Sequence, residues 1–204
     1  LKTQRELNPN KQDDVHPPKL KTLREVGKER NVEVPLPDLE LNNEYRTLDS
    51  LIKSSQVVVV GRVTSEDASF KGDNHIITTY ALDIQRVLRD TTSAMPALQN
   101  IASPAPVTSP FTFYRDGGEV KVNGHQVSEK LKGSELLTPG NDYVLFLTWS
   151  PNFGAYRLVA GASGAFLIKN NLRIHPLGSK PELKLKHDDT DLDTFIGEVL
   201  KVNS

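Results

Sequence analysis

The sequence has no cysteine, one tryptophan, one methionine and no long apolar run. Without cysteine the chain has no disulfide framework, no thiolate ligand for zinc and no cysteine nucleophile. Its longest apolar run, residues 143–147, is far shorter than the roughly 20 residues of a membrane-spanning helix, so no transmembrane segment is expected. The 25 Lys and Arg nearly balance the 26 Asp and Glu, which argues against nucleic acid as a partner because binding to phosphates needs a basic excess.

Apolar residues are unevenly spread along the 204 residues. The first 55 residues contain 15 of them, and the remaining 149 contain 60. So few apolar side chains offset little of the entropy that folding removes, and we expect residues 1–45 to form a disordered or extended leader. A single domain follows over residues 46–204. Residues 90–110, rich in Pro, Ser and Ala, interrupt this domain, and we expect them to be disordered or to wrap around it in an extended form.

The domain is predicted to be mainly β. Residues 56–63 are apolar or β-branched at most positions, which is typical of a central strand buried on both faces. Gly61 within this strand predicts a bulge. Residues 75–88 alternate between apolar and polar, as a strand with one packed face does. The residues expected on that packed face are Ile76, Tyr80, Leu82, Ile84 and Leu88.

Two hairpins and two helices complete the predicted domain. Asn123–Gly124 supplies the two positive φ angles of a type I′ turn, and a second hairpin is predicted over residues 165–175. A short helix is expected after Thr47, and a C-terminal helix over residues 192–200, where apolar residues recur at helical spacing. With five or six antiparallel strands, a small closed barrel is the predicted fold, because closure removes exposed strand edges.

The order of these segments resembles a known architecture. The resemblance is carried by residues 54–63 (SSQVVVVGRV), the long alternating strand, residues 115–124 (RDGGEVKVNG) and residues 137–147 (LTPGNDYVLFL). In these segments the chain resembles uncharacterised exported bacterial β-domains. More distantly, it is similar to the netrin-like domains of tissue inhibitors of metalloproteinases, which are OB-type barrels. The resemblance covers about residues 47–170.

The resemblance implies a fold and a location, but no inhibitory mechanism. It implies an OB-type or netrin-like barrel that is periplasmic, secreted or lipid-anchored, with an anchor that would lie upstream of this chain. Tissue inhibitors of metalloproteinases chelate the zinc of their target through an amino-terminal cysteine, and this chain has no cysteine. Their mode of inhibition is therefore not carried over.

No pattern in the sequence forms a catalytic or metal centre, and we expect no catalytic residue, metal or cofactor. Residues 161–164 (GASG) are one residue too short for the nucleophile elbow G-x-S-x-G, so a plain turn is favoured. The aspartates in residues 188–193 lack the Gly and Glu of a calcium-binding loop, and acidic residues are favoured at a helix start. An alternative is a hydrolase that uses His75 or His125 with nearby carboxylates, Asp73 among them.

Three aromatic residues and one arginine near strand ends are the candidates for ligand binding. OB-type barrels stack sugars or bases on such side chains. The candidates are Tyr114, Arg115, Trp149 and Phe153. We therefore expect a non-enzymatic binding or interaction module of the bacterial envelope or exterior, whose partner is a protein or a glycan. A barrel that binds oligosaccharide or single-stranded nucleic acid is the alternative among binding functions.

Overall fold

The computed structural model describes residues 21–35, 47–92, 111–130, 135–178 and 180–202. The fold is mainly β, as predicted, but the described residues contain eleven strands rather than five or six. In chain order the elements are α1 (Leu23–Gly27), β1 (Val32–Pro35), α2 (Leu48–Ser54), β2 (Val57–Lys71), β3 (His75–Asp90), β4 (Phe111–Asp116), β5 (Gly118–Val122), β6 (His125–Lys130), β7 (Asp142–Ser150), β8 (Ala155–Leu158), the 3-10 helix η3 (Gly161–Gly164), β9 (Ala165–Ile168), β10 (Arg173–Pro176), α3 (Pro181–His187), β11 (Thr190–Asp191) and α4 (Leu192–Lys201).

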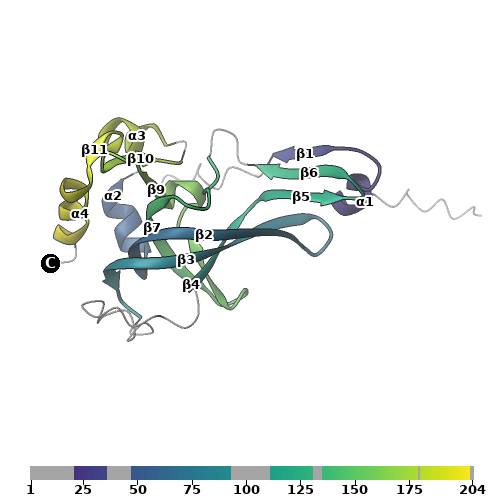
Figure 1. The fold of residues 1–204 in the computed structure, drawn as a ribbon. Helices are drawn as coiled ribbons and strands as arrows, with labels where there is room; N and C mark the ends of the chain where they lie inside the picture. The colour runs from purple at the N-terminus through teal and green to yellow at the C-terminus, as the bar shows by residue number, and fades with distance from the viewer. Residues whose placement is uncertain (1–20, 36–46, 93–110, 131–134, 179, 203–204) are drawn as a thin grey trace, which may run out of the picture.

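The main sheet has eight strands in the order β11-β10-β9-β7-β2-β3-β4-β8 (Figure 1). Its last strand, β8, pairs in parallel with β4 and also antiparallel with β7. One edge of β7 is thus shared, because residues 142–145 pair with β9 and residues 147–150 pair with β8. The strands β7, β2, β3, β4 and β8 therefore hydrogen-bond in a closed circuit, which we call the strand circuit.

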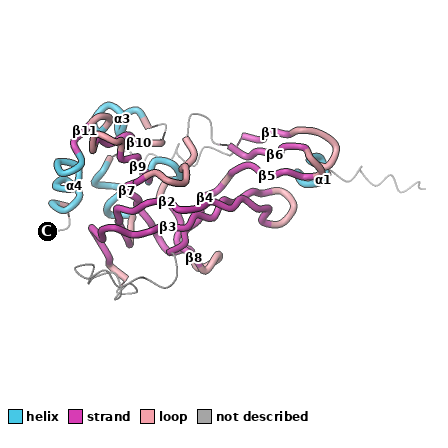
Figure 2. The backbone as a smooth tube through the Cα atoms, in the orientation of Figure 1, coloured by secondary structure: helices cyan, strands magenta, loops and turns pink. Residues whose placement is uncertain are grey.

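A second sheet, with the order β1-β6-β5, lies beside the end of β2 and β3 that is opposite to α4 (Figures 1 and 2). Its β5–β6 hairpin turns at Asn123 and Gly124, whose φ angles of 51° and 85° confirm the predicted turn. β1 pairs in parallel with β6. Both α1 and β1 lie within the segment that we expected to be a disordered or extended leader. Residues 1–20 and 36–45 of that leader and residues 93–110 of the insert lie outside the described residues.

Two buried clusters pack on the two faces of the central strands. Along β2, Val57 and Val59 belong to the first cluster, whereas Val58 and Val60 belong to the second. The first cluster takes side chains from all five strands of the strand circuit. The second packs β2, β7, β9 and β10 against α2, α3 and α4. The prediction of a central strand buried on both faces is confirmed, because a period of two sends alternate valines to opposite sides.

Irregular pairing between β2 and β3 changes which side chains meet. The pairing shifts between Val60 and Gly61, as the glycine predicted, and a Cβ at Gly61 would lie 2.7 Å from the carbonyl oxygen of Asp83. Two register shifts leave Gln85 and Leu88 of β3 without a directly paired residue on β2. The predicted face of Leu88 is wrong for this reason, since it packs in the second cluster and not with Tyr80 and Leu82.

Both predicted helices are confirmed. Thr47 caps α2, and its hydroxyl accepts the backbone N–H of Ser50 at 3.2 Å. Asp191 caps α4 and accepts the backbone N–H groups of Asp193 and Thr194. The sequence did not predict α3. Among the described residues, no helix combines the length and apolar character needed to cross a membrane.

Candidate functional site

Aromatic side chains gather where β4, β7 and β8 meet. Trp149 on β7 is 43% exposed, and its ring lies edge-on to that of Tyr156, the paired residue on β8, with 5.3 Å between centroids. The ring of Tyr156 also lies 5.3 Å from that of Phe111 on β4. We call Phe111, Trp149 and Tyr156 the Trp149 cluster. An exposed tryptophan held in place by packed neighbours offers a ligand a broad apolar surface with a hydrogen-bond donor.

Tyr114 and Phe153 form a second aromatic pair. Their rings stack with centroids 4.3 Å apart, and the ammonium group of Lys71 lies 4.6 Å from the centre of the Phe153 ring. Tyr114 is buried beneath Phe153 and lies on the opposite face of β4 from Phe111, because side chains alternate along a strand. Trp149 and Phe153 therefore belong to two separate aromatic groups, whereas the sequence analysis had taken them together.

Arg115 is held within the fold. Its side chain is 5% exposed, and its Nη1 donates to the carbonyl oxygen of Glu135 at 2.6 Å. It also lies near the hydroxyl of Tyr80, where burial raises the pKa of Tyr80 to about 12 although the positive charge of Arg115 opposes this rise. Of the four candidates, Arg115 and Tyr114 are thus both buried, whereas Trp149 is exposed.

His75 lies between two carboxylates where the two sheets meet. Its Nε2 is 3.0 Å from Asp116 Oδ1 at the end of β4, and its Nδ1 is 3.1 Å from Glu129 Oε1 on β6. Glu129 is buried, and its Oε2 accepts the backbone N–H of Ile76 at 2.5 Å. These contacts join β3, β4 and β6, and we call His75, Asp116 and Glu129 the His75 cluster.

Both ring nitrogens of His75 are occupied, and an imidazole donates from both only when it is protonated. Partial burial alone would lower the pKa of His75, but the hydrogen bonds to Asp116 and Glu129, with their negative charges, outweigh burial and raise it. In this arrangement His75 has no free nitrogen with which to take a proton from a substrate. The His75 cluster therefore links the strands β3, β4 and β6.

The other residues of the hydrolase alternative lie apart from this cluster. The Asp73 carboxylate is 3.7 Å from Arg24 Nη1 of α1, and His75 bonds to Asp116 and Glu129 instead. His125 begins β6, whereas Glu129 lies near the other end of that strand. The sequence pointed to His75 but not to Asp116 or Glu129, because both come from distant strands.

The His75 cluster predicts how the free energy of unfolding changes with pH. Because the pKa of His75 is raised on folding, its stabilising effect is complete below the unfolded value of about 6.5 and is lost as pH rises through the folded value. We expect the free energy of unfolding, measured with urea from about pH 5 to about pH 9, to fall more steeply above pH 6.5 in the unaltered protein than in His75→Gln. Parallel profiles for the two proteins would contradict this assignment.

A second histidine with two carboxylates was missed by the sequence analysis. His175 on β10 has its Nδ1 2.8 Å from Asp188 Oδ1 and its Nε2 3.2 Å from Glu135 Oε1. The hydrogen bond from His175 is the main cause that lowers the pKa of Asp188, and Lys169 adds to it from 3.6 Å. No local spacing marks this group, because its members lie 13 and 40 residues from His175.

The serine of residues 161–164 is buried, and two of the aspartates in residues 188–193 are bonded within the fold. Ser163 lies buried in η3, so close to Gly178 that a Cβ there would be 2.2 Å from the serine Oγ. Its hydroxyl is therefore not presented as a nucleophile. Asp188 and Asp191 bind His175 and cap α4, respectively. Across the described ranges, no three His, Asp or Glu side chains are placed to hold a metal ion.

Compared with known proteins, the chain matches no protein family and no curated protein.

Proposed function

We propose that this protein is a non-enzymatic binding module built on an OB-type, netrin-like barrel. Numbered from β2, the strands of the circuit β2, β3, β4, β8 and β7 have the order 1-2-3-5-4, with a parallel pair between the third and fifth. This is the strand order of an OB-type barrel, and the bulge at Gly61 supplies the bend that such a small barrel needs. The barrel is the scaffold, and its function depends on the surface that it presents.

The ligand surface that we propose is the Trp149 cluster. The observation that carries the proposal is that Trp149 stands 43% exposed although it is braced by Tyr156. Tryptophan is enriched among the residues that dominate binding energy, and its ring stacks well on sugars and on apolar protein surfaces. The partner is a protein or a glycan. The net charge of −1 argues against single-stranded nucleic acid, whose phosphates attract basic surfaces.

Two further considerations support the non-enzymatic assignment and the location. His75 and His175 each have both ring nitrogens bonded to carboxylates, so the contacts of these two histidines strengthen the fold. The resemblance to exported bacterial β-domains favours a location in the envelope or outside the cell. A signal peptide encoded upstream of residue 1 would support this location, and an upstream sequence that encodes a cytoplasmic domain would contradict it.

Trp149 is the only tryptophan, so its fluorescence reports directly on ligand binding. We expect the emission of Trp149 to change on titration with a bacterial-envelope glycan or with a partner captured from envelope extracts. Calorimetry should show at least a ~10-fold weaker affinity for Trp149→Ala, because this change removes the broadest exposed contact. Circular dichroism spectra would confirm that the variant is folded.

Leu185→Ala is the matched control. Leu185 on α3 is 88% exposed and apolar, but it lies outside the Trp149 cluster, so its replacement should leave the affinity unchanged. A partner that binds Trp149→Ala as tightly as the unaltered protein would refute the proposed surface. If the emission of Trp149 did not change with any glycan, single-stranded DNA or envelope extract, this result would count against the binding function itself.

A further inference from the structure

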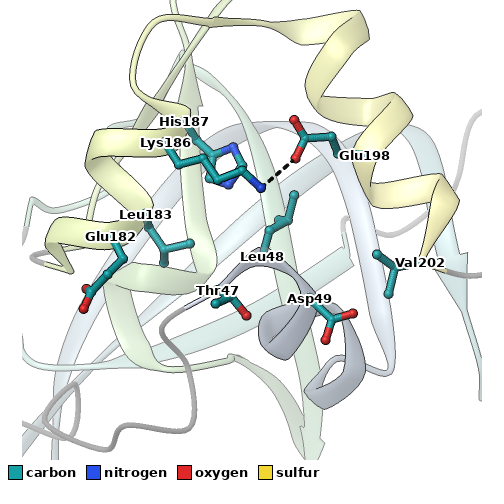
Figure 3. Close-up of a pocket in the computed structure, with 9 residues that line it drawn as sticks. All are labelled: Thr47, Leu48, Asp49, Glu182, Leu183, Lys186, His187, Glu198 and Val202. Carbon is teal, nitrogen blue, oxygen red and sulfur yellow. Dashed lines mark ion pairs between the residues drawn. The ribbon is translucent and has the colours of Figure 1, made fainter.

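A pocket of about 200 Å³ lies between α2, α3 and α4 (Figure 3). Leu48, Leu183 and Val202 provide its apolar lining. Its charged lining residues include Lys186 and Glu198, whose Nζ and Oε2 atoms are 3.3 Å apart. For comparison, a cavity of roughly 150 Å³ holds a benzene molecule, so this pocket has room for a molecule built on one small ring.

One lining residue, His187, is buried without a hydrogen-bond partner. It ends α3 and is 1% exposed, and within the described part of the chain neither Nδ1 nor Nε2 has a partner. The imidazole packs edge-on against Phe195, with 5.4 Å between ring centroids, a contact that a phenyl ring would also make. Buried polar side chains in folded proteins are nearly always satisfied, because an unpaired donor or acceptor destabilises the fold. His187 thus occupies a buried position at which an apolar ring would pack equally well and leave no polar atom unpaired.

The ion pair beside His187 is suited to admit a ligand. Figure 3 shows the Lys186 side chain and its link to Glu198 next to the imidazole, between α3 and α4. The Lys186 side chain is largely exposed, and ion pairs at a protein surface are weak, so the pair separates at little cost. Burial is the main cause that lowers the pKa of His187, which keeps the ring neutral, with one N–H donor and one acceptor nitrogen.

We propose that this pocket binds a small uncharged molecule with a compact apolar body and a hydroxyl or amide group that hydrogen-bonds to His187. An apolar body matches the leucines and the valine of the lining. A neutral polar group matches a neutral imidazole, and Lys186 and Glu198 already pair with each other, so a charged group would have to displace one of them. The site is separate from the Trp149 cluster, so either proposal can fail without the other.

The test uses benzyl alcohol and benzamide as neutral probes, with benzylamine and benzoate as charged ones. We expect the neutral probes to shift the His187 ring resonances in NMR spectra, with dissociation constants on the order of 1 mM. His187→Phe should weaken binding at least ~10-fold, whereas His187→Gln, which keeps a donor and an acceptor, should stay within a few-fold. His125→Gln, a replacement on β6 outside the pocket, should change nothing.

Stability separates a ligand-binding role from a merely structural one. Because the imidazole is unsatisfied without ligand, His187→Phe should leave the urea midpoint unchanged or raise it. A clear fall of the midpoint would show that the imidazole serves the fold and would overturn the proposal. The proposal would also be overturned if the neutral probes shifted no His187 resonance, or if His187→Phe bound them as tightly as the unaltered protein. Tighter binding of benzylamine or benzoate than of the neutral probes would overturn it as well.

Discussion

Replacing Gly164 with alanine is expected to lower the free energy of unfolding by about 3 kcal/mol or more. A Cβ at this position would lie 2.2 Å from the carbonyl oxygen of Val159 and 3.2 Å from that of Phe146. Both neighbours are backbone, and they are tied together because Val159 N–H donates to Phe146 O at 2.9 Å. Side-chain rotation cannot relieve the contact, so the backbone at the η3–β9 junction must move.

Gly197→Ala is the control for this prediction. Gly197 lies within α4, and a Cβ there has no neighbour within 4 Å. The alanine should raise the free energy of unfolding by about 0.5–1 kcal/mol, because glycine is a poor helix former. Urea denaturation followed by circular dichroism measures both variants. Equal effects of the two alanines would show that close packing at Gly164 does not limit stability.

Glu129→Ala is expected to lower the free energy of unfolding by about 3 kcal/mol. The buried carboxylate accepts the backbone N–H of Ile76 and lies beside the ring of His75. Its removal leaves the buried N–H of Ile76 without its acceptor and leaves His75 with Asp116 alone. Glu129→Gln should lower the free energy of unfolding by about half as much, because the amide oxygen can still accept the backbone N–H of Ile76. Urea denaturation gives the values, and hydrogen exchange should locate the loosening at β3 and β6.

Glu119→Ala tests whether burial causes this effect. Glu119 on the neighbouring strand β5 forms an ion pair with Lys130 in which both side chains are partly exposed to solvent. Such pairs contribute about 0–1 kcal/mol to the free energy of unfolding, so Glu119→Ala should lower it by no more than this. If Glu119→Ala lowered the free energy of unfolding as much as Glu129→Ala, burial of the carboxylate would not be the cause of the effect.

The candidate site shows why only part of it was predictable. Trp149 was chosen as a candidate from its place near a strand end, and its side chain is exposed. Arg115 was chosen for the same reason, but it is buried and donates to the carbonyl oxygen of Glu135. His187 gave no signal, because its burial depends on α3, an element that the sequence did not predict.

The sequence by itself determined the features that depend on near neighbours. The alternating valines of β2, the turn at Asn123–Gly124 and the cap at Thr47 follow from local backbone and side-chain chemistry. Only the tertiary structure decided the parallel pairing of β4 with β8 and the meeting of His75 with Glu129, 54 residues away. Such contacts depend on how whole strands close upon one another, and the periodicity of a single segment carries no information about its distant partner.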